Sequence, residues 1–454
     1  MLKHRVFAPL RRNLCEPLDA LRSGTPRLRY WKELEHSQYL PESELRQIQW
    51  RKLMDLLDYV WDHNSFHRER LERAGITPDM IRTPADFMKI PMIRKEDIRS
   101  NIGKMISSGY DCDSLMKFKT GGSTGKALEI YMTEACSEFR NACARRHDRW
   151  TGWEPGEPVG AAWGNPEFPH DLKSRLRDWF LSPVIYLDTM SVTEKSVRVF
   201  ATEWKRVRPT LLYGHAHSIF LLAEYVRKLD LTGISPKGIL STSMMLMPHE
   251  RRTIEDVFGI KVTDRYGCEE VSLIASECEK HEGMHLNIEH LFIEFIKDDG
   301  TLAAPGEPGK IVVTDLMNRA MPFIRYQVED VGIPSDRECS CGRGLPLMEH
   351  VTGRIADFLI KRDGTRIAGV SLIENTLTKI PGIEQMQIIQ ETVNIITINL
   401  VVGDGFGQDE ENELVTYFHG LFGNESKVLI NRKKIIATET NGKYMFSICR
   451  VKLD

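Results

Sequence analysis

Apolar positions recur at helical spacing in the first hundred residues of the chain. Between residues 41 and 100 one apolar face repeats at intervals of three and four, and Pro84 and Pro91 end the region. This face consists of Leu53, Leu56, Leu57, Val60 and Trp61. The spacing predicts a mainly helical N-terminal region covering residues 1–100.

From about residue 115 to residue 350 the pattern changes to short apolar runs that alternate with helical stretches. The runs at 210–213 and 238–240 predict strands, and the stretch 218–229 predicts a helix. Two more predicted strands, 291–297 and 310–316, are separated by an Asp-Asp-Gly turn. This alternation is typical of an α/β architecture.

The last hundred residues predict a separate small α+β domain. Its expected elements are a helix at 370–380, strands at 385–390 and 395–402, a helix at 410–422 and a strand at 427–436. We place the boundary near residues 353–357. This gives an N-terminal domain of residues 1–353 and a C-terminal domain of residues 354–454.

Composition restricts the class of protein. The 454 residues include 61 Lys and Arg against 64 Asp and Glu, a formal charge of −3 that gives no support for a nucleic-acid binder. No apolar run reaches the roughly 18 to 20 residues that a membrane helix needs, and no apolar segment typical of a secretory signal follows the basic N-terminus. The nine cysteines, an odd number, favour a reducing cytoplasm over a disulfide framework.

The loop from Lys119 to Lys126 carries the strongest local signal for chemistry. Its three glycines let backbone N–H groups turn toward an anion, and hydroxyl groups and a lysine add donors. The loop is not a Walker A motif, because Thr120 stands where the first glycine is required and Ala127 where a Ser or Thr is required. The alternative is a flexible Gly/Ser/Thr turn.

Four further motifs follow along the chain. The stretch 264–270 offers acidic oxygens that suit Mg²⁺, and Tyr266 can stack on a base. Asp330 can accept hydrogen bonds from both hydroxyls of a ribose, and Arg354 can pair with a phosphate. Lys443, on an Asn-Gly-Lys turn, can neutralise developing negative charge. Taken singly, each is also compatible with an ordinary surface position.

The order and spacing of these motifs resemble the adenylate-forming superfamily, specifically its phenylacetate–CoA ligase and CapK-like branch. Residues 120–126 look like the family's phosphate loop, and Tyr266-Gly-Cys-Glu-Glu270 resembles its Tyr-Gly-x-Thr-Glu motif. Arg325-Tyr-Gln-Val-Glu-Asp330 resembles Arg-Tyr-x-x-Gly-Asp, and Gly353-Arg354 and Gly442-Lys443 match later motifs. The resemblance runs from about residue 40 to the end of the chain.

The resemblance implies a large multi-sheet N-terminal domain that binds ATP and the acid. It also implies a small mobile α+β domain that rotates about a hinge near Asp357. Catalytic roles fall on Lys443, Lys126 and Glu270, with Glu270 also holding Mg²⁺. The residues that would contact the nucleotide are Thr120, Gly121, Gly122, Ser123, Thr124, Gly125, Tyr266, Gly267, Asp330 and Arg354.

The implied reaction is activation of a small-molecule carboxylic acid by ATP to an acyl-adenylate with release of pyrophosphate. Acyl transfer to coenzyme A would follow. One alternative is transfer to an amine, hydroxyl or carrier, since CapK-like relatives are associated with polysaccharide biosynthesis. The other is a non-catalytic nucleotide-binding protein. The sequence does not name the acid, and it leaves a homodimer open.

Three positions depart from the family pattern. Glu269 replaces the usual Thr, Glu329 replaces the Gly before the ribose-binding Asp, and Met244 replaces an acidic residue. These departures weaken the prediction of ordinary CoA-ligase activity more than they weaken the prediction of nucleotide binding.

A compact thiol pair, Cys339 and Cys341, predicts a metal site together with Cys278 and one histidine. Three cysteines and a histidine form a tetrahedral set suited to structural zinc. His281 gives a tight spacing from Cys278, whereas His285 stands where relatives have Gly-x-His, so we favour His285. Reduced surface thiols are the alternative.

Two more histidines, His215 and His217, occur in a Tyr-Gly-His-Ala-His stretch. No nucleophile motif such as G-x-S-x-G accompanies them. They could line the acid pocket or sit at the end of a strand, and we favour the pocket.

Overall fold

The structure is a computed structural model of the 454-residue chain. It describes residues 7–119, 128–163, 180, 181, 183–188, 192–243, 245–354, 358–362, 366–368, 372, 376, 380–403, 405–434, 436 and 447–451. The chain divides into two compact units. The first comprises Met1–Glu307, Ile311–Val328 and Pro334–His350, and the second comprises Pro308–Lys310, Glu329–Ile333 and Val351–Asp454.

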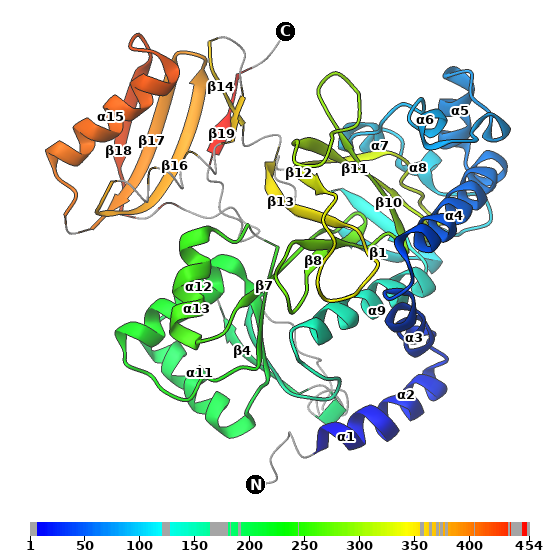
Figure 1. The fold of residues 1–454 in the computed structure, drawn as a ribbon, viewed down its shortest axis with the longest axis horizontal. Helices are drawn as coiled ribbons and strands as arrows, with labels where there is room; N and C mark the ends of the chain where they lie inside the picture. Colours follow the sequence, from blue (N-terminus) through cyan, green and yellow to red (C-terminus); the bar gives the residue numbers. More distant parts are fainter. Residues whose placement is uncertain are drawn as a thin grey trace. The chain divides into compact units, whose positions relative to one another are not determined.

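The first unit begins with short helices, as the apolar spacing predicts, and α4 to α8 gather beside β10 (Figure 1). They are α1 (Ala8–Leu10), η2 (Arg11–Cys15), α2 (Glu16–Ser23), α3 (Arg27–Ser37), α4 (Glu42–His63), α5 (Ser65–Arg73), η3 (Pro78–Met80), α6 (Pro84–Phe87), α7 (Lys95–Arg99), α8 (Ile102–Met105) and η4 (Cys112–Ser114). Leu53, Leu56, Leu57 and Val60 of α4 are fully buried, so the predicted apolar face is confirmed.

An eleven-stranded sheet follows, in the order β10-β11-β12-β13-β9-β8-β7-β6-β5-β3-β4. The strands are β3 (Val159–Trp163), β4 (Val184–Asp188), β5 (Leu211–His215), β6 (Gly238–Thr242), β7 (Val262–Cys268), β8 (Ser272–Glu277), β9 (Met284–Leu286), β10 (Leu291–Ile296), β11 (Gly309–Asp315), β12 (Tyr326–Ser335) and β13 (Leu347–Arg354). Strands β4, β3, β5, β6 and β7 run parallel, and β8 and β9 continue the sheet antiparallel. The predicted α/β class is confirmed.

The parallel strands are connected by helices that carry one apolar face. These are α11 (Glu194–Val207), α12 (Ala216–Lys228) and α13 (Pro248–Phe258); α9 (Glu134–Trp150) follows the hairpin of β1 (Met116–Lys119) and β2 (Glu129–Met132). Trp204 of α11 lies so close to β3 that a Cβ atom on Gly160 would be 2.1 Å from its ring. A glycine is therefore required where this helix meets the sheet.

The second unit contains a four-stranded sheet in the order β18-β17-β16-β19 and one long helix. Its elements are β14 (Phe358–Ile360), β15 (Arg366–Ala368), β16 (Ile383–Thr392), β17 (Ile395–Val402), α15 (Gln408–Phe422), β18 (Lys427–Arg432) and β19 (Ser447–Cys449). Ile388, Ile398 and Phe418 are fully buried in its core. The predicted strands β16 and β17 and helix α15 are confirmed; β18 ends at Arg432, earlier than expected.

Some predictions fall outside the described residues. Most of the predicted helix at 370–380 does so, as does the proposed hinge at Asp357. Among the helices that the structure describes, none has the length and apolar character needed to cross a membrane.

Candidate active site and metal centre

The carboxyl ends of the parallel strands bring aromatic and polar side chains to one edge of the sheet. Trp163 ends β3 and His215 ends β5, and their ring centroids lie 3.9 Å apart. His215 pairs in register with Thr242 of β6, which pairs with Arg265 of β7. In open α/β sheets this edge is where ligands bind. His215 therefore lies where a pocket residue would be expected.

His217 is held by an acidic residue from another helix. Its Nδ1 lies 2.9 Å from Oε1 of Glu250 in α13, and Oε2 of Glu250 accepts a hydrogen bond from the Met247 amide at 3.2 Å. Glu250 is buried, whereas the side chain of His217 is one-third exposed. The carboxylate thus orients the imidazole at the surface of α12.

Glu270 follows β7 and is the centre of a buried polar cluster. Its Oε1 accepts a hydrogen bond from the Tyr326 hydroxyl at 3.0 Å and lies 3.3 Å from Nζ of Lys95. The side chain of Glu270 is only 4% exposed and that of Lys95 15%. Burial raises the pKa of Glu270, but the Lys95 charge and the hydrogen bonds outweigh it, so its pKa is lowered overall.

Lys95 reaches Glu270 because the segment before it pairs with the strand that carries Tyr326. The Ile93 amide donates to the Arg325 carbonyl, and the Gln327 amide donates to the Ile93 carbonyl, both at 2.9 Å. This parallel bridge brings Lys95, two residues further on, beside the carboxylate. The sequence analysis assigned no role to Lys95 or Tyr326, because neither is near Glu270 in the sequence.

The turn that carries Glu270 is fixed from behind by a buried arginine that the sequence analysis also missed. Arg140 of α9 donates to the Glu270 carbonyl at 2.9 Å and to the Glu269 carbonyl at 3.3 Å. The same guanidinium pairs with Asp315 at 2.8 Å. Glu269, which departs from the family pattern, has an exposed side chain, so the turn is held through its backbone.

Within the same motif, Gly267 has a steric reason to be glycine. A Cβ atom there would lie 2.5 Å from the Ser272 carbonyl oxygen, where β7 and β8 shift register. Tyr266 beside it is half-buried. Asp330, on β12, is buried and belongs to the second unit.

The other expected nucleotide contacts lie outside the described residues. They are Thr120, Gly121, Gly122, Ser123, Thr124, Gly125, Lys126 and Lys443, together with the altered position Met244. Arg354 lies in β13 and Glu329 in β12, but their side chains are not among the described ones. The roles of all these residues stay predictions.

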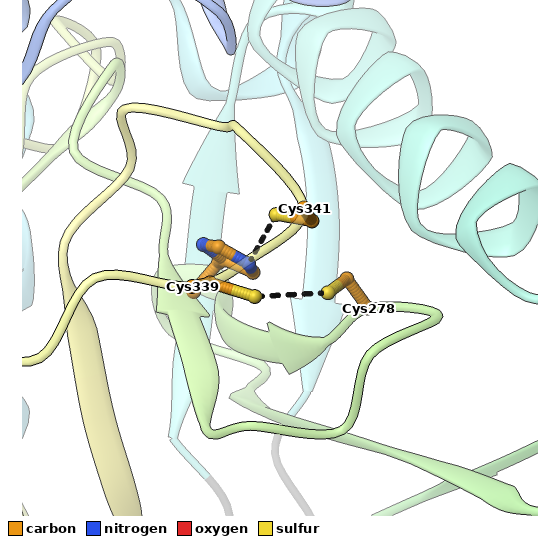
Figure 2. Close-up of side chains that lie close together, drawn as sticks. Cys278, Cys339 and Cys341 are labelled. Atoms are coloured by element: carbon orange, nitrogen blue, oxygen red, sulfur yellow. Dashed lines mark hydrogen bonds between the residues drawn. The ribbon is translucent and has the colours of Figure 1, made fainter.

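Three cysteines and one histidine converge after β8. The sulfur of Cys278 lies 3.6 Å from that of Cys339, and the sulfur of Cys341 lies 3.4 Å from Nε2 of His285 (Figure 2). All four donor atoms lie within 4.8 Å of one another. Cys278, His285 and Cys339 are buried, and Cys341 is half-buried. Four convergent soft donors are what a tetrahedral zinc site requires.

The surrounding hydrogen bonds leave these donors facing inward. The amide of Lys280 donates to Cys278 and that of Arg343 to Cys341, each at 3.4 Å and each two residues after its cysteine. Nδ1 of His285 lies 3.1 Å from the Leu345 carbonyl, so Nε2 is left for the cluster. Fixing one ring nitrogen on a carbonyl is how metal-bound histidines are oriented.

The alternative histidine has a different partner. Nδ1 of His281 lies 3.2 Å from Glu277, and among the described residues the group that can hold a metal includes His285 and not His281. Burial lowers the pKa of His285, but the thiols of Cys278 and Cys341 outweigh it and raise the pKa to about 9. Burial raises the pKa of the Cys341 thiol, but the contact with His285 and the hydrogen bonds from nearby donors outweigh burial and lower the pKa to about 6.

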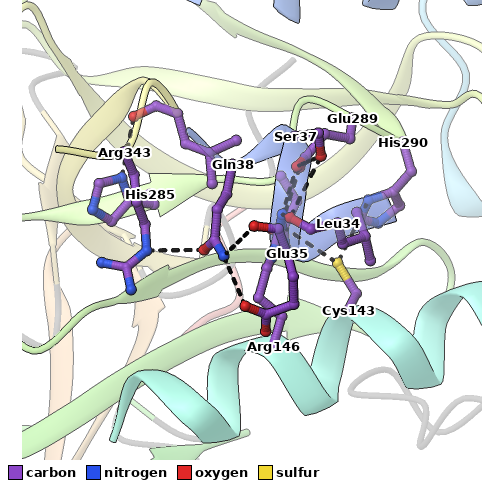
Figure 3. A network of polar contacts seen from close by, with 12 residues as sticks. Leu34, Glu35, Ser37, Gln38, Cys143, Arg146, His285, Glu289, His290 and Arg343 are labelled. Atoms are coloured by element: carbon purple, nitrogen blue, oxygen red, sulfur yellow. Dashed lines mark hydrogen bonds and ion pairs between the residues drawn. The ribbon is translucent and has the colours of Figure 1, made fainter. Parts of the chain in front are cut away.

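A polar network joins this cluster to two helices. Arg343 donates to Oε1 of Gln38 at 2.9 Å, and Gln38 in turn donates to Glu35 (Figure 3). Trp150 donates to the same Gln38 oxygen at 3.0 Å. The Trp150 ring lies edge-on to His285, with centroids 5.5 Å apart. Through this network the cluster is connected to α3, α9 and the sheet.

Comparison with known proteins agrees with this arrangement. Residues 359–450 match the family model of the CapK C-terminal domain. Phenylacetate-coenzyme A ligase of Thermus thermophilus is 27% identical over 343 residues, 73% of this chain and 75% of that protein. Protein CapK of Staphylococcus aureus is 21% identical over 90% of each chain.

Among solved structures, 2-hydroxyisobutyryl-CoA ligase in its postadenylation state is similar in fold. It has a TM-score of 0.73 at 19% identity and covers 91% of each chain. The chain is thus similar in sequence to phenylacetate-coenzyme A ligases and to protein CapK, and similar in fold to 2-hydroxyisobutyryl-CoA ligase.

Proposed function

We propose that the protein activates a carboxylic acid with ATP to an acyl-adenylate, releases pyrophosphate, and transfers the acyl group to the thiol of coenzyme A with release of AMP. The observation that carries the proposal is the buried Glu270 carboxylate, two residues after the end of β7 and within the Tyr266–Glu270 motif. The named activity of relatives from Thermus thermophilus and Escherichia coli, phenylacetate-coenzyme A ligases that align over 75% and 73% of their own lengths, supports it.

In this proposal the substrate carboxylate attacks the α-phosphorus of ATP, and pyrophosphate leaves. Residues 120–126 hold the phosphates through N–H and hydroxyl donors, while Lys126 and Lys443 offset the charge that develops. Tyr266 and Gly267 contact the adenine side, Asp330 the ribose, and Arg354 the nucleotide. Glu270 is the hard oxygen donor that would hold Mg²⁺, which neutralises phosphate charge when bound.

We assign the acid-binding position to the carboxyl ends of β3 and β5. Trp163 supplies an apolar ring there, and His215 lies against it. His217, oriented by Glu250, is a further polar group on α12. An acid panel tested with His215→Ala should show changed preference among acids, with ATP binding retained.

A second candidate differs only in the acyl acceptor. Transfer to an amine, hydroxyl or carrier follows from the association of CapK-like relatives with polysaccharide biosynthesis, and residues 359–450 match the CapK C-terminal domain. Product analysis with and without coenzyme A separates the two candidates, because only the first forms a thioester.

The direct test is ATP–pyrophosphate exchange over a panel of carboxylic acids. We expect exchange that depends on one class of acid and falls by orders of magnitude in Lys443→Ala, with ATP binding nearly unchanged. Binding of Mg-ATP without exchange on any acid would favour a non-catalytic nucleotide-binding protein.

We also propose that Cys278, His285, Cys339 and Cys341 hold a structural zinc ion. The inward-facing donors and the Leu345 contact of His285 support this. All four ligands come from the protein, so the ion would tie the segment after β8 to the loop before β13 without taking part in the reaction. Protein that contains no stoichiometric metal by elemental analysis would contradict it.

A further inference from the structure

A cavity of about 680 Å³ opens between α4, the start of α6 and β10, and neither Glu270 nor its partners are among the residues that line it. We propose that it binds an amphiphilic small-molecule anion, whose apolar body fills the cavity and whose anionic group lies at the mouth. A volume of this size is in the range of small-molecule sites. The proposal does not rest on the proposed reaction, because none of the residues that carry it belongs to the nucleotide motifs.

The walls of the cavity are apolar and partly open to water. The rings of Trp50 and Phe292 lie with their centroids 6.3 Å apart, and Met88 is half-buried beside them. Leu302 is 50% exposed. It is held there by the hairpin after β10, in which the Ala303 amide donates to the Phe295 carbonyl at 2.8 Å. Covering such surface with an apolar ring or chain is favourable.

The charged residues of the lining are mostly cationic. Arg51 and Arg82 are exposed, and neither side chain enters an ion pair or hydrogen bond with any other described residue. Arg46 also lines the cavity and is paired with Glu42. The acidic residue of the lining, Glu294, does not offset the two free guanidiniums, because it is buried and paired with Arg325 at 3.0 Å.

This combination selects the class of ligand. A neutral apolar molecule would leave the two guanidiniums without a partner, and a small inorganic anion would leave the apolar walls exposed. A carboxylate, sulfonate or phosphate ester on a ring or alkyl chain meets both, since guanidinium groups bind such anions through paired N–H donors.

The test uses 8-anilinonaphthalene-1-sulfonate, a fluorescent aromatic sulfonate, with the full chain. We expect saturable binding that weakens at least fivefold in the double variant Arg51→Gln, Arg82→Gln. Leu302→Trp, which fills the mouth, should weaken it similarly. Arg68→Gln, at an exposed arginine of α5 away from the cavity, is the matched control and should bind like the unaltered protein. Circular dichroism verifies that each variant is folded.

Competition with other compounds identifies the anionic group of the ligand. It also tests whether the ligand needs both an apolar body and an anionic group. Octanoate and octyl phosphate should displace the dye, and the stronger competitor identifies the anionic group. Octanol or inorganic phosphate displacing it equally well would overturn the proposal, as would equal affinity in all variants. Loss of dye binding on self-association, measured by sedimentation, would instead show that a second copy of the chain covers the cavity.

Discussion

Glu270 and Cys278 lie just before and just after the same strand, β8, which spans roughly 20 Å of extended chain. Before the strand, a buried carboxylate meets the ammonium of Lys95 and the hydroxyl of Tyr326. After it, three sulfurs and an imidazole meet one another, with backbone amides and carbonyls as their outer partners.

The difference between these two ends lies in where the compensating positive charge comes from. At Glu270 the protein itself supplies a positive charge, through Lys95. At the cysteine end the proton on His285 balances the charge of one thiolate at most. A metal site of three cysteines and one histidine needs all three cysteines as thiolates. If the proposed zinc site is correct, the cysteine cluster needs a cation from solution, whereas the Glu270 carboxylate has a counter-charge within the protein.

The largest effect is expected at the metal end. Cys278→Ser or His285→Ala should lower bound zinc from about one ion per chain to almost none. The free energy of unfolding should fall by more than about 4 kcal/mol, because loss of a structural metal is among the most destabilising changes. Elemental analysis and urea unfolding measure the two effects.

His281→Ala is the matched control for this prediction, since the His281 side chain contacts Glu277, and its hydrogen bond to Cys278 is made by the backbone amide. It should retain the metal. Equal unfolding curves for the unaltered protein with and without a chelator would remove the distinction between the two ends of β8.

Glu270→Gln is expected to have the next largest effect. It leaves Lys95 buried without its counter-charge, which should cost about 3 kcal/mol of folding stability. Acid-dependent ATP–pyrophosphate exchange should fall by roughly 10² to 10³-fold, the range for losing one charged group at a reacting centre. Exchange at the unaltered rate would show that the cluster is structural only.

Lys95→Met should be milder and should depend on pH. It removes the charge that lowers the pKa of Glu270, so the variant should lose about 2 kcal/mol at neutral pH. A carboxylate with a lowered folded pKa contributes stability above its ordinary pKa of 4.5, and this contribution is lost as the pH falls through the folded value. The stability difference between the two proteins should therefore shrink below pH 4.5.

An exposed lysine–glutamate pair provides the control for Lys95. Lys104 and Glu69 lie 2.9 Å apart with side chains 54% and 38% exposed. Lys104→Met should cost much less than Lys95→Met, because water screens such pairs. Equal losses in the two lysine variants, measured by urea unfolding from pH 3 to pH 7, would mean that burial of Glu270 adds nothing.

The cysteine end was more accessible to sequence analysis than the Glu270 end. Cys339 and Cys341 are two residues apart, so their spacing alone predicts a site. The choice between His281 and His285 depends on local backbone: His281 has a positive φ of 55° in the turn after Cys278, while His285 lies in β9, paired with Leu347. This distinction requires the strand register, which spacing does not provide.

The partners of Glu270 could not be predicted from spacing. The bridge between Ile93 and Tyr326 positions Lys95 beside the carboxylate, and Arg140 of α9 binds the Glu270 carbonyl. Each depends on pairing between distant segments. The order of strands and helices was predictable because alternation of apolar runs is a local property, and the apolar face of α4 was predictable for the same reason.

Tyr326→Phe should have the smallest effect at the Glu270 end. It removes a neutral donor at 3.0 Å and leaves the Lys95 charge in place, so the loss should be about 1 kcal/mol. Because both groups contact the same oxygen, Tyr326→Phe and Lys95→Met should not be additive, and a double-mutant cycle should give a coupling of at least about 0.5 kcal/mol. Strict additivity would mean that the hydroxyl and the ammonium stabilise Glu270 independently, and the cluster would then be two separate contacts instead of one unit.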